Sequence, residues 1–349
     1  MIELNERIEA LAALGDYLAQ SIDNIEEDNN SDFKELLQKA EAHNAWFTQE
    51  FLSLAINNIV KMLDKNALAY WVSNYNASSF KDSDIRVGVV MAGNIPLVGF
   101  HDFLSVIISG RVFVGKLSSG DQLLLPYLAK RLVDIDSRFH SKIFFEEHLL
   151  KDFDAVIATG SNNSSRYFDF YFGKYPNIIR HNRNSVALLS GEETKEELGL
   201  LAKDIFSYFG LGCRNVSKLM LPRNYDIPSL LDEFQSFDYL SMHNKYFNNY
   251  EYNKSLLLIN KEAHFDNGFL LLKENPALST PVSVLHYEFY DDKEEEIERL
   301  NRANEQIQCV LSAEKGLQNG VLLGESQSPT LMQYADNVDV MEFLLQLEK

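Results

Sequence analysis

The sequence contains little cysteine: Cys213 and Cys309 are the only two in 349 residues, and they stand far apart. Two isolated cysteines exclude a scaffold built on disulfides, and without clustered cysteine and histidine no metal site is expected. The chain also lacks an uninterrupted apolar run of the roughly 20 residues that a membrane-spanning helix needs. Its first residues include Glu3, Glu6 and Glu9 and no basic segment, which predicts an amphipathic helix and not a signal peptide. The expected location is therefore cytoplasmic.

The sequence also contains few positively charged residues relative to negatively charged ones. There are 32 Lys and Arg residues against 51 Asp and Glu residues, which gives a formal net charge of -19. Such a surface repels phosphate backbones and anionic lipid headgroups, so nucleic acids and membrane surfaces are poor partners. Hydrophobic residues make up 46% of the chain and charged residues 24%, which is a globular composition. A length of 349 residues suits two domains better than one.

The pattern of apolar residues predicts an α/β fold. Residues 1–80 show helical spacing, which predicts a helical N-terminus. From Asp84 onward, short β-branched runs that are apolar on both faces alternate with helical stretches. This is typical of a parallel sheet covered on both sides, so we expect a doubly wound, dinucleotide-binding domain. We place that domain at residues 1–190 and a second α/β domain, the catalytic cysteine domain, at residues 191–315, with the tail 316–349 packing back on the first.

Cys213 is the first candidate for chemistry. The helical stretch before it ends in Gly210 and Gly212, which permit a tight left-handed turn, and a strand follows. A thiol at such a junction is where nucleophiles tend to lie, and the neighbouring cation of Arg214 favours the thiolate. The alternative is that Cys213 is a small buried hydrophobic residue, as free cysteine usually is. We expect that alternative for Cys309, which lies inside an alternating strand.

Asn94 is the second candidate. It follows Ala92 and Gly93 at the end of a buried strand, which is where doubly wound folds bind ligands. Its amide could donate a hydrogen bond to an oxyanion. A helix cap is the plainer interpretation, with the helix beginning at or just after Pro96. The G-x-G-x-x-G spacing of the ordinary dinucleotide fingerprint is absent here.

Two more turns follow strands. Lys116 ends one strand and leads into Ser118 and Ser119, a small polar turn that could meet ribose or phosphate. Gly160 and Ser161 lead from another strand into a helix, whose first amides would suit a pyrophosphate. The alternatives are an ordinary exposed lysine and routine turn chemistry.

In their order along the chain, these motifs resemble the aldehyde dehydrogenase superfamily: Gly-Asn-x-Pro, Lys-x-Ser, Thr-Gly-Ser and then Gly-x-Gly-Cys. The segment that starts at Thr280-Pro281-Val282 resembles the strand and helix that follow the superfamily's Gly-Pro-Val motif. The similarity spans residues 84–345. The short length and the final segment resemble the acyl-CoA reductase branch, the LuxC-like (lux-type) fatty acid reductases.

The resemblance implies a role for each motif. Cys213 would be the nucleophile, and Asn94 would stabilise the oxyanion beside the backbone amide of Cys213. Lys116 would contact the adenosine ribose, and Gly160 and Ser161 would lie at the pyrophosphate and nicotinamide side of the cofactor. The adjoining turn residues would complete the cofactor site: Ala92, Gly93, Ser118 and Ser119.

Two glutamates of aldehyde-oxidising members are missing. The position of the general base falls on Arg180, and that of the second glutamate, which contacts the nicotinamide ribose, falls on Ala277. Without the base, water is poorly activated to hydrolyse a thioester, which suits exchange with a thiol. Ser119 stands where NAD-using members often carry glutamate. It leaves room for a 2′-phosphate and favours NADPH over NADH.

The resemblance therefore predicts NADPH-dependent reduction of an activated fatty acyl group, an acyl-CoA or acyl-carrier thioester, to the aldehyde through a thioester on Cys213. An acyl-activating partner protein and a homo-oligomer are further expectations. Three alternatives stay open. They are an acylating dehydrogenase for a short or phosphorylated acyl substrate, a cysteine acyltransferase or thioesterase without a redox step, and a catalytically inactive relative that binds a nucleotide. The sequence does not identify the acid that protonates the leaving thiol.

Overall fold

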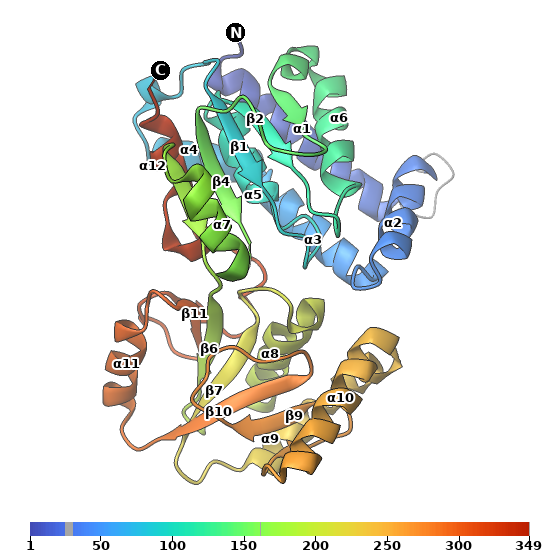
Figure 1. The fold of residues 1–349 in the computed structure, drawn as a ribbon, viewed down its shortest axis with the longest axis vertical. Helices are drawn as coiled ribbons and strands as arrows, with labels where there is room; N and C mark the ends of the chain where they lie inside the picture. Colours follow the sequence, from blue (N-terminus) through green and yellow to red (C-terminus); the bar gives the residue numbers. More distant parts are fainter. Residues whose placement is uncertain (25–30, 161, 349) are drawn as a thin grey trace. The chain divides into compact units, whose positions relative to one another are not determined.

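The computed structural model describes residues 1–24, 31–160 and 162–348. The chain divides into two compact units, coloured along the sequence in Figure 1. The first unit comprises Met1–Asn182 with Thr330–Lys349, and the second comprises Arg183–Pro329. Within the described ranges, no helix is long and apolar enough to cross a membrane, and no group of three or more His, Cys, Asp or Glu side chains could hold a metal ion. Which unit carries which part of the chemistry remains a prediction.

The first unit is built on a five-stranded parallel sheet with the order β3-β2-β1-β4-β5. The strands are β1 (Arg86–Val90), β2 (Val112–Lys116), β3 (Ile143–Phe145), β4 (Ala155–Thr159) and β5 (Asn177–Arg180). The strand order reverses its direction between β1 and β4. The carboxyl ends of these two strands therefore border a topological switch point, where open parallel sheets bind ligands. This confirms the predicted doubly wound class.

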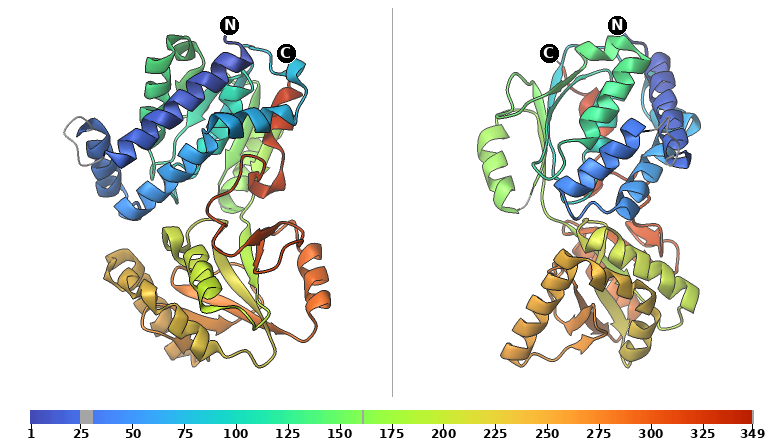
Figure 2. Two further views of the ribbon diagram at one scale, coloured as in Figure 1. Left: turned by 180° about the vertical axis from the view of Figure 1, so that it is seen from behind. Right: turned by 90° about the vertical axis from the view of Figure 1, so that its right-hand side faces the viewer.

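Helices cover both faces of this sheet. Figure 2 shows α7 on one face and α1 and α6 on the other. The first four helices form the predicted helical N-terminus. Two of them, α3 and α4, are capped by Thr48 and Asp64, whose side chains accept backbone N–H groups of the first turn. The elements are α1 (Leu4–Asp23), α2 (Ser31–His43), α3 (Gln49–Met62), α4 (Lys65–Ser73), η2 (Ala77–Ser79), α5 (Phe100–Ile108), α6 (Leu124–Ile135), η3 (Ser137–Ser141), α7 (Asn162–Phe172), η6 (Ala335–Asn337) and α12 (Val340–Leu345).

The C-terminal tail is fastened to the N-terminal helices of the same unit. The Trp71 indole donates to the Tyr334 hydroxyl at 2.7 Å, and the Tyr75 hydroxyl donates to Asp339 at 2.8 Å. Helix α12 adds apolar contacts by burying Val340, Met341 and Leu344. The two ends of the chain therefore share one core.

The second unit is built on a seven-stranded sheet with the order β12-β11-β6-β7-β10-β9-β8. All neighbouring strands are parallel except β8 and β9. The strands are β6 (Asn184–Leu188), β7 (Val216–Pro222), β8 (Phe265–Asp266), β9 (Leu271–Glu274), β10 (Val284–Tyr290), β11 (Ile307–Ser312) and β12 (Gly320–Leu322). The helices are α8 (Lys195–Phe206), η4 (Ser207–Gly210), α9 (Ile227–Glu233), η5 (Gln235–Met242), α10 (Asn244–Asn260) and α11 (Lys293–Arg302).

Candidate active site

Cys213 lies in the second unit, between η4 and β7. Its side chain is exposed, so the interpretation of this cysteine as a buried hydrophobic residue is wrong. An accessible thiol at the start of a central strand is in a position to act as a nucleophile. The catalytic role itself remains a prediction.

The turn that leads to this thiol is strained. Tyr208, Phe209 and Gly210 have φ angles of 52°, 57° and 74°, all in the left-handed region. Gly210 adopts this conformation readily, as the sequence predicted, whereas a residue with a side chain is held there at a cost of roughly 1–2 kcal/mol. Packing fixes Phe209, because its ring centroid lies 4.3 Å from that of His243 and 5.7 Å from that of Tyr246. Strain of this kind concentrates at functional sites.

Asn215 fastens the same turn from its other end. Its buried side chain accepts from the Gly212 N–H at 2.8 Å and donates to the carbonyls of Asp204 and Ser207 at 3.0 and 2.8 Å. These carbonyls stand at the end of α8, where backbone acceptors have no helical partner. One carboxamide therefore closes the helix and fixes the peptide that precedes Cys213.

The backbone on the other side of the thiol is held by β6. The Ser185 hydroxyl donates to the Cys213 carbonyl at 2.9 Å. Cys309 on β11 is buried, as expected, and burial raises the pKa of its thiol. The Arg214 guanidinium donates to the Cys309 sulfur at 3.2 Å. The cation that was expected to activate Cys213 therefore lies against the second, buried cysteine.

Asn94 lies in the first unit, in the turn after β1. Helix α5 begins at Phe100 with Gly99 at its N-cap, so the helix predicted to begin at or just after Pro96 starts later. The physical reason is Leu97, whose φ of 56° is left-handed and cannot continue into a right-handed helix. The interpretation of Asn94 as the helix cap is therefore wrong.

Asp121 holds the turn that contains Asn94. Its carboxylate accepts from the Leu97 N–H at 2.8 Å. Burial raises the pKa of Asp121, and the backbone hydrogen bonds that it accepts only partly offset this. The turn also packs closely on the next one, because a Cβ on Gly93 would lie 2.6 Å from the Ser118 hydroxyl oxygen. Only glycine fits at this approach.

The other residues predicted for the cofactor lie at the same edge of the sheet. Ala92 follows β1, and Lys116 ends the neighbouring β2. The Lys116 ammonium donates to the Glu147 carbonyl, so it is anchored and not simply solvated. The Ser119 carbonyl lies 2.7 Å from Nε2 of His43, which brings an imidazole to this turn.

The carboxyl end of β4 meets an ion pair formed by Arg180, the residue at the position where aldehyde-oxidising members have their general base. Gly160 directly follows Thr159, and Ser161 lies outside the described residues. The buried Arg180 guanidinium donates to both carboxylate oxygens of Asp102 at 2.5 and 2.7 Å and to the Thr159 hydroxyl at 3.1 Å. A bidentate pair of this kind ties β5, α5 and β4 together. Arg180 is therefore a structural cation.

Ala277, at the position of the second missing glutamate, lies on an exposed loop of the second unit. Nδ1 of His286 donates to its carbonyl at 2.9 Å, and the Lys218 ammonium donates to the Pro276 carbonyl at 2.7 Å. Burial lowers the pKa of both side chains. The loop is therefore held by its backbone, and its Ala277 side chain offers no hydrogen bond to a ribose.

The structure thus gathers the predicted residues into two groups, one in each unit. Sequence reasoning missed the side chains that hold the groups in place: Asp102, Asp121, Ser185 and Asn215. A signal was present for one of them, because Asp102 is an acidic residue in the mostly apolar helix Phe100–Ile108. A buried acid in such a run usually has a partner.

Several solved aldehyde dehydrogenases share this fold. Aldehyde dehydrogenase 21 of Physcomitrella patens, in complex with succinate, has a TM-score of 0.64 and 12% identity over 98% of this chain and 87% of that one. Glyceraldehyde-3-phosphate dehydrogenase GapN of Methanocaldococcus jannaschii, complexed with NADP, has a TM-score of 0.62 and 13% identity over 93% and 82%. A mutant aldehyde dehydrogenase C of Pseudomonas syringae, with NAD+ and octanal, has a TM-score of 0.61 and 12% identity over 90% and 77%. The chain therefore has the aldehyde dehydrogenase fold, as its motifs predicted.

The sequence also matches a family, although no curated protein sequence matches it. The family is described as Acyl-CoA reductase (LuxC), and the match covers residues 1–222, more than half of the chain. That range includes both Asn94 and Cys213. The chain belongs to this family, which confirms the predicted branch. It is an oxidoreductase, and its reaction is the reduction of an acyl group to an aldehyde.

Proposed function

We propose that the chain reduces an acyl-CoA or acyl-carrier thioester to the aldehyde with NADPH and carries the acyl group as a thioester on Cys213. One observation carries the proposal: the exposed thiol stands at a turn whose backbone is fixed on both sides. Asn215 holds the peptide before it and Ser185 holds its carbonyl. A fixed backbone presents a nucleophile in one orientation, which lowers the entropic part of the barrier.

The acyl group is transferred by exchange of one thioester for another. The Cys213 thiolate attacks the thioester carbonyl carbon, a new C–S bond forms, and the carbonyl oxygen becomes an oxyanion. When the carbonyl re-forms, the bond to the CoA or carrier sulfur breaks and that thiol leaves as a thiolate. The proposed role of Asn94 is to donate its amide hydrogen to the oxyanion. After reduction, the oxyanion on the same carbon collapses to the aldehyde, the C–S bond breaks, and the Cys213 thiolate is restored.

The turns after β1, β2 and β4 fit a nicotinamide cofactor. Gly93 lets the turn after β1 pack directly on the Ser118 side chain after β2, so the two turns lie together at the carboxyl edge of the sheet, where doubly wound folds bind their ligands. The residues that would hold the cofactor are Ala92, Gly93, Lys116, Ser118, Ser119, Gly160 and Ser161. When bound there, the cofactor supplies the hydride that reduces the acyl carbon. The Ser119 side chain is uncharged, and its backbone carbonyl lies beside Nε2 of His43. A 2′-phosphate would meet no carboxylate at Ser119, which favours NADPH.

The ion pair of Arg180 argues against a thioesterase. A base that activates water needs a carboxylate or imidazole within reach of the acyl group. At the position where related enzymes have one, this chain has a cation that is already bound to Asp102. The acyl-enzyme is therefore expected to survive until it is reduced.

The test is to follow NADPH oxidation and aldehyde formation with a series of acyl-CoA substrates. The proposal expects one aldehyde for each NADPH oxidised, and a weaker response with NADH. Ser119→Glu should weaken NADPH binding more than NADH binding, because the new carboxylate repels the 2′-phosphate. Release of CoA without NADPH consumption would instead identify a thioesterase or acyltransferase. Cofactor binding without turnover of any acyl-CoA would identify an inactive relative.

A further inference from the structure

The C-terminal end of helix α2 contacts one of the turns predicted to bind the cofactor. His43 is the last residue of α2, and its Nε2 lies 2.7 Å from the Ser119 carbonyl oxygen. The next residue, Asn44, donates from its side-chain amide to the Gly120 carbonyl at 3.1 Å. The chemistry above gives these two residues of the N-terminal helical region no role.

The turn itself is packed between α2 and the turn after β1. The Ser118 hydroxyl accepts from the Gly120 N–H at 3.2 Å. A Cβ on Gly120 would lie 2.7 Å from the Gly93 carbonyl oxygen, so only glycine allows the two turns to approach this closely. The imidazole of His43 therefore meets a fixed turn, and it does so at Ser119, the residue beside which the 2′-phosphate is expected.

The two ring nitrogens of His43 have different surroundings. A carbonyl oxygen only accepts, so Nε2 carries a hydrogen and donates it to Ser119. Nδ1 forms no hydrogen bond with any residue that the structure describes, and the residue is exposed. In the protonated ring, Nδ1 is therefore a second donor that a ligand at this turn can use. The last turn of a helix also favours a positive charge, because its backbone carbonyls carry the negative end of the helix dipole.

Positive charge is scarce in this chain, and a phosphate bound at this turn needs a nearby cation. Lys116 is one candidate, but its ammonium already donates to the Glu147 carbonyl. His43 is the second, and its charge acts on this turn: burial raises the pKa of Asp121, and the charge of His43 is one of the effects that oppose this rise. Asp121 is buried, whereas His43 is exposed. The imidazole is therefore much more accessible to a ligand than the carboxylate is.

We propose that His43 binds the 2′-phosphate of NADPH. In this arrangement Nε2 holds the ring against the Ser119 carbonyl, and the protonated Nδ1 donates a charge-assisted hydrogen bond to a phosphate oxygen. The phosphate in turn stabilises the protonated ring, because the two charges are opposite. NADH carries a hydroxyl in place of the phosphate and gains nothing from the charge. The inference rests on the proposed use of NADPH and identifies His43 as a residue that determines cofactor preference.

Cofactor titrations test this inference without any acyl substrate. We would measure the dissociation constants of NADPH and NADH by calorimetry at one pH, together with those of 2′,5′-ADP and 5′-AMP, which carry only the adenosine end of each cofactor. His43→Gln can keep an N–H for the Ser119 carbonyl but removes the charge. It should weaken the binding of NADPH and 2′,5′-ADP about tenfold, a size typical of one hydrogen bond to a charged group, and change that of NADH and 5′-AMP by less than about twofold. His43→Lys keeps the charge and should retain more of the preference for NADPH.

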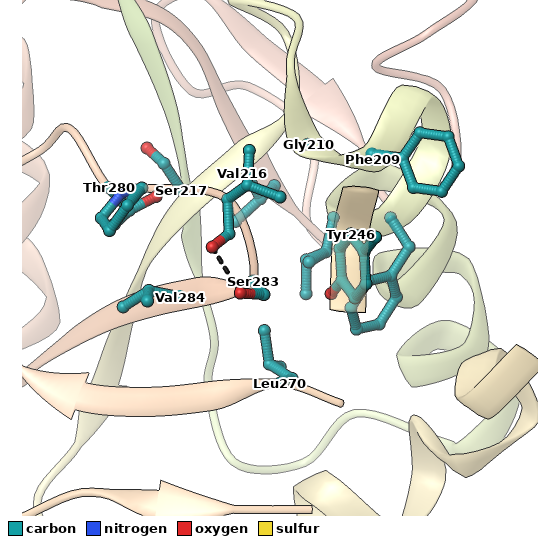
Figure 3. Close-up of a pocket in the computed structure, with 13 residues that line it drawn as sticks. Phe209, Gly210, Val216, Ser217, Tyr246, Leu270, Thr280, Ser283 and Val284 are labelled. Atoms are coloured by element: carbon teal, nitrogen blue, oxygen red, sulfur yellow. Dashed lines mark hydrogen bonds between the residues drawn. The ribbon is translucent and has the colours of Figure 1, made fainter. Parts of the chain in front are cut away.

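Two controls separate a local charge effect from general damage. His140 is also an exposed histidine of the first unit, but it precedes β3 and so lies toward the amino ends of the strands, at the opposite edge of the sheet. His140→Gln should change no dissociation constant. Leu270 is buried in the second unit, where it lines a small and mostly apolar pocket (Figure 3). Leu270→Ala should lower the melting temperature without changing the ratio of the two dissociation constants, because NADPH and NADH differ only in the 2′-phosphate.

The outcomes distinguish this inference from the proposed function. Equal losses of NADPH and NADH affinity in His43→Gln would mean that His43 only supports the turn, and would overturn the inference. So would an unchanged preference for NADPH in that variant, or the same preference in His43→Lys as in His43→Gln. If the preference depends on His43 but no acyl-CoA is reduced, the proposed reaction fails and the role of His43 stands. If wild type reduces acyl-CoA with NADPH while His43→Gln keeps the preference, only the role of His43 fails. Equal affinity of wild type for both cofactors would overturn the NADPH preference and the role of His43 together.

Discussion

The Asn94 turn (residues 92–97) and the Cys213 turn (residues 208–215) have similar backbone conformations but are held by different side chains. Each joins regular elements, and each contains a residue with a side chain in the left-handed conformation: Leu97 in one, Tyr208 and Phe209 in the other. Each is also held by a buried polar side chain, and the Cys213 turn has a further hydrogen bond from the Ser185 hydroxyl to the Cys213 carbonyl. In the first that side chain is the carboxylate of Asp121, and in the second it is the carboxamide of Asn215.

The difference determines how each turn responds to pH. A carboxamide donates and accepts at once and does not titrate, so the Asn215 clamp is the same at every pH in the physiological range. A buried carboxylate only accepts, and burial penalises its charge. We infer that the turn carrying the proposed nucleophile is built for constant geometry, whereas the turn carrying the proposed oxyanion donor is stabilised by a group that is sensitive to pH.

The largest expected effect comes from Asn94→Ala. Loss of one oxyanion donor typically costs about 2.7–4 kcal/mol of transition-state stabilisation, or about 10²–10³ in rate. We expect the single-turnover rate of Cys213 acylation to fall by that factor while the melting temperature changes little. We expect Asn94→Ala to keep its stability because Gly99, and not Asn94, occupies the N-cap of α5. A destabilised variant whose folded fraction acylates normally would show that Asn94 is only structural.

A smaller effect is expected from Asn215→Ala, which breaks the clamp of the Cys213 turn. The variant leaves the Gly212 N–H and the carbonyls of Asp204 and Ser207 without this partner, and each such buried group costs about 1–3 kcal/mol. We expect lower stability together with acylation of Cys213 slowed about tenfold, measured on protein confirmed to be folded.

The control for Asn215→Ala is Ser326→Ala in the same unit. Ser326 is fully buried and donates to Asp204 at 2.6 Å, so its loss should also lower stability. It does not touch the Cys213 turn and should leave the acylation rate unchanged. Equal rate losses in the two variants would mean that Asn215 contributes only to general stability.

The smallest effect concerns the pH dependence of the Asn94 turn. Burial raises the pKa of Asp121, so the folded protein holds this proton more tightly than the unfolded chain does. The contribution of Asp121 to the free energy of unfolding is fully present below about pH 3.9, the pKa of an aspartate in the unfolded chain. It is lost as the pH rises through the higher pKa of Asp121 in the folded protein. Asp121→Asn keeps an acceptor for the Leu97 N–H and cannot ionise. The free energy of unfolding is measured with urea at a series of pH values. In Asp121→Asn it should not show this decrease with rising pH, whereas in the control Asp16→Asn, at an exposed position, the decrease should remain as in wild type. Identical pH profiles for wild type and Asp121→Asn would contradict this account.

Much of the fold could be predicted from the sequence, because buried parallel strands leave a clear pattern. The helical N-terminus and the doubly wound sheet are as expected. The start of α5 was predicted wrongly, because proline favours a helix start locally, whereas the left-handed Leu97 delays the helix to Phe100. No single-sequence pattern signals that conformation for a leucine.

The side chains that hold the candidate site could not be predicted, because their partners are distant in sequence. Asp102 pairs with Arg180 across 78 positions, and Leu97 pairs with Asp121 across 24. Arg214 is the sequence neighbour of Cys213, and its guanidinium also reaches Cys309, 95 positions away. Adjacency along the chain is a poor guide to electrostatic contact at a turn, where successive side chains point in different directions.

Mapping the acyl group on the protein tests whether Cys213 is the nucleophile. Wild type, Cys213→Ala and Cys309→Ala are incubated with isotope-labelled acyl-CoA without NADPH, quenched, digested and analysed by mass spectrometry. We expect one acyl group on Cys213 in wild type and in Cys309→Ala, and none in Cys213→Ala. We also expect the label to be released as aldehyde when NADPH is added to the acylated protein. Label on Cys309, or label on neither cysteine, would contradict the role of Cys213 as the nucleophile.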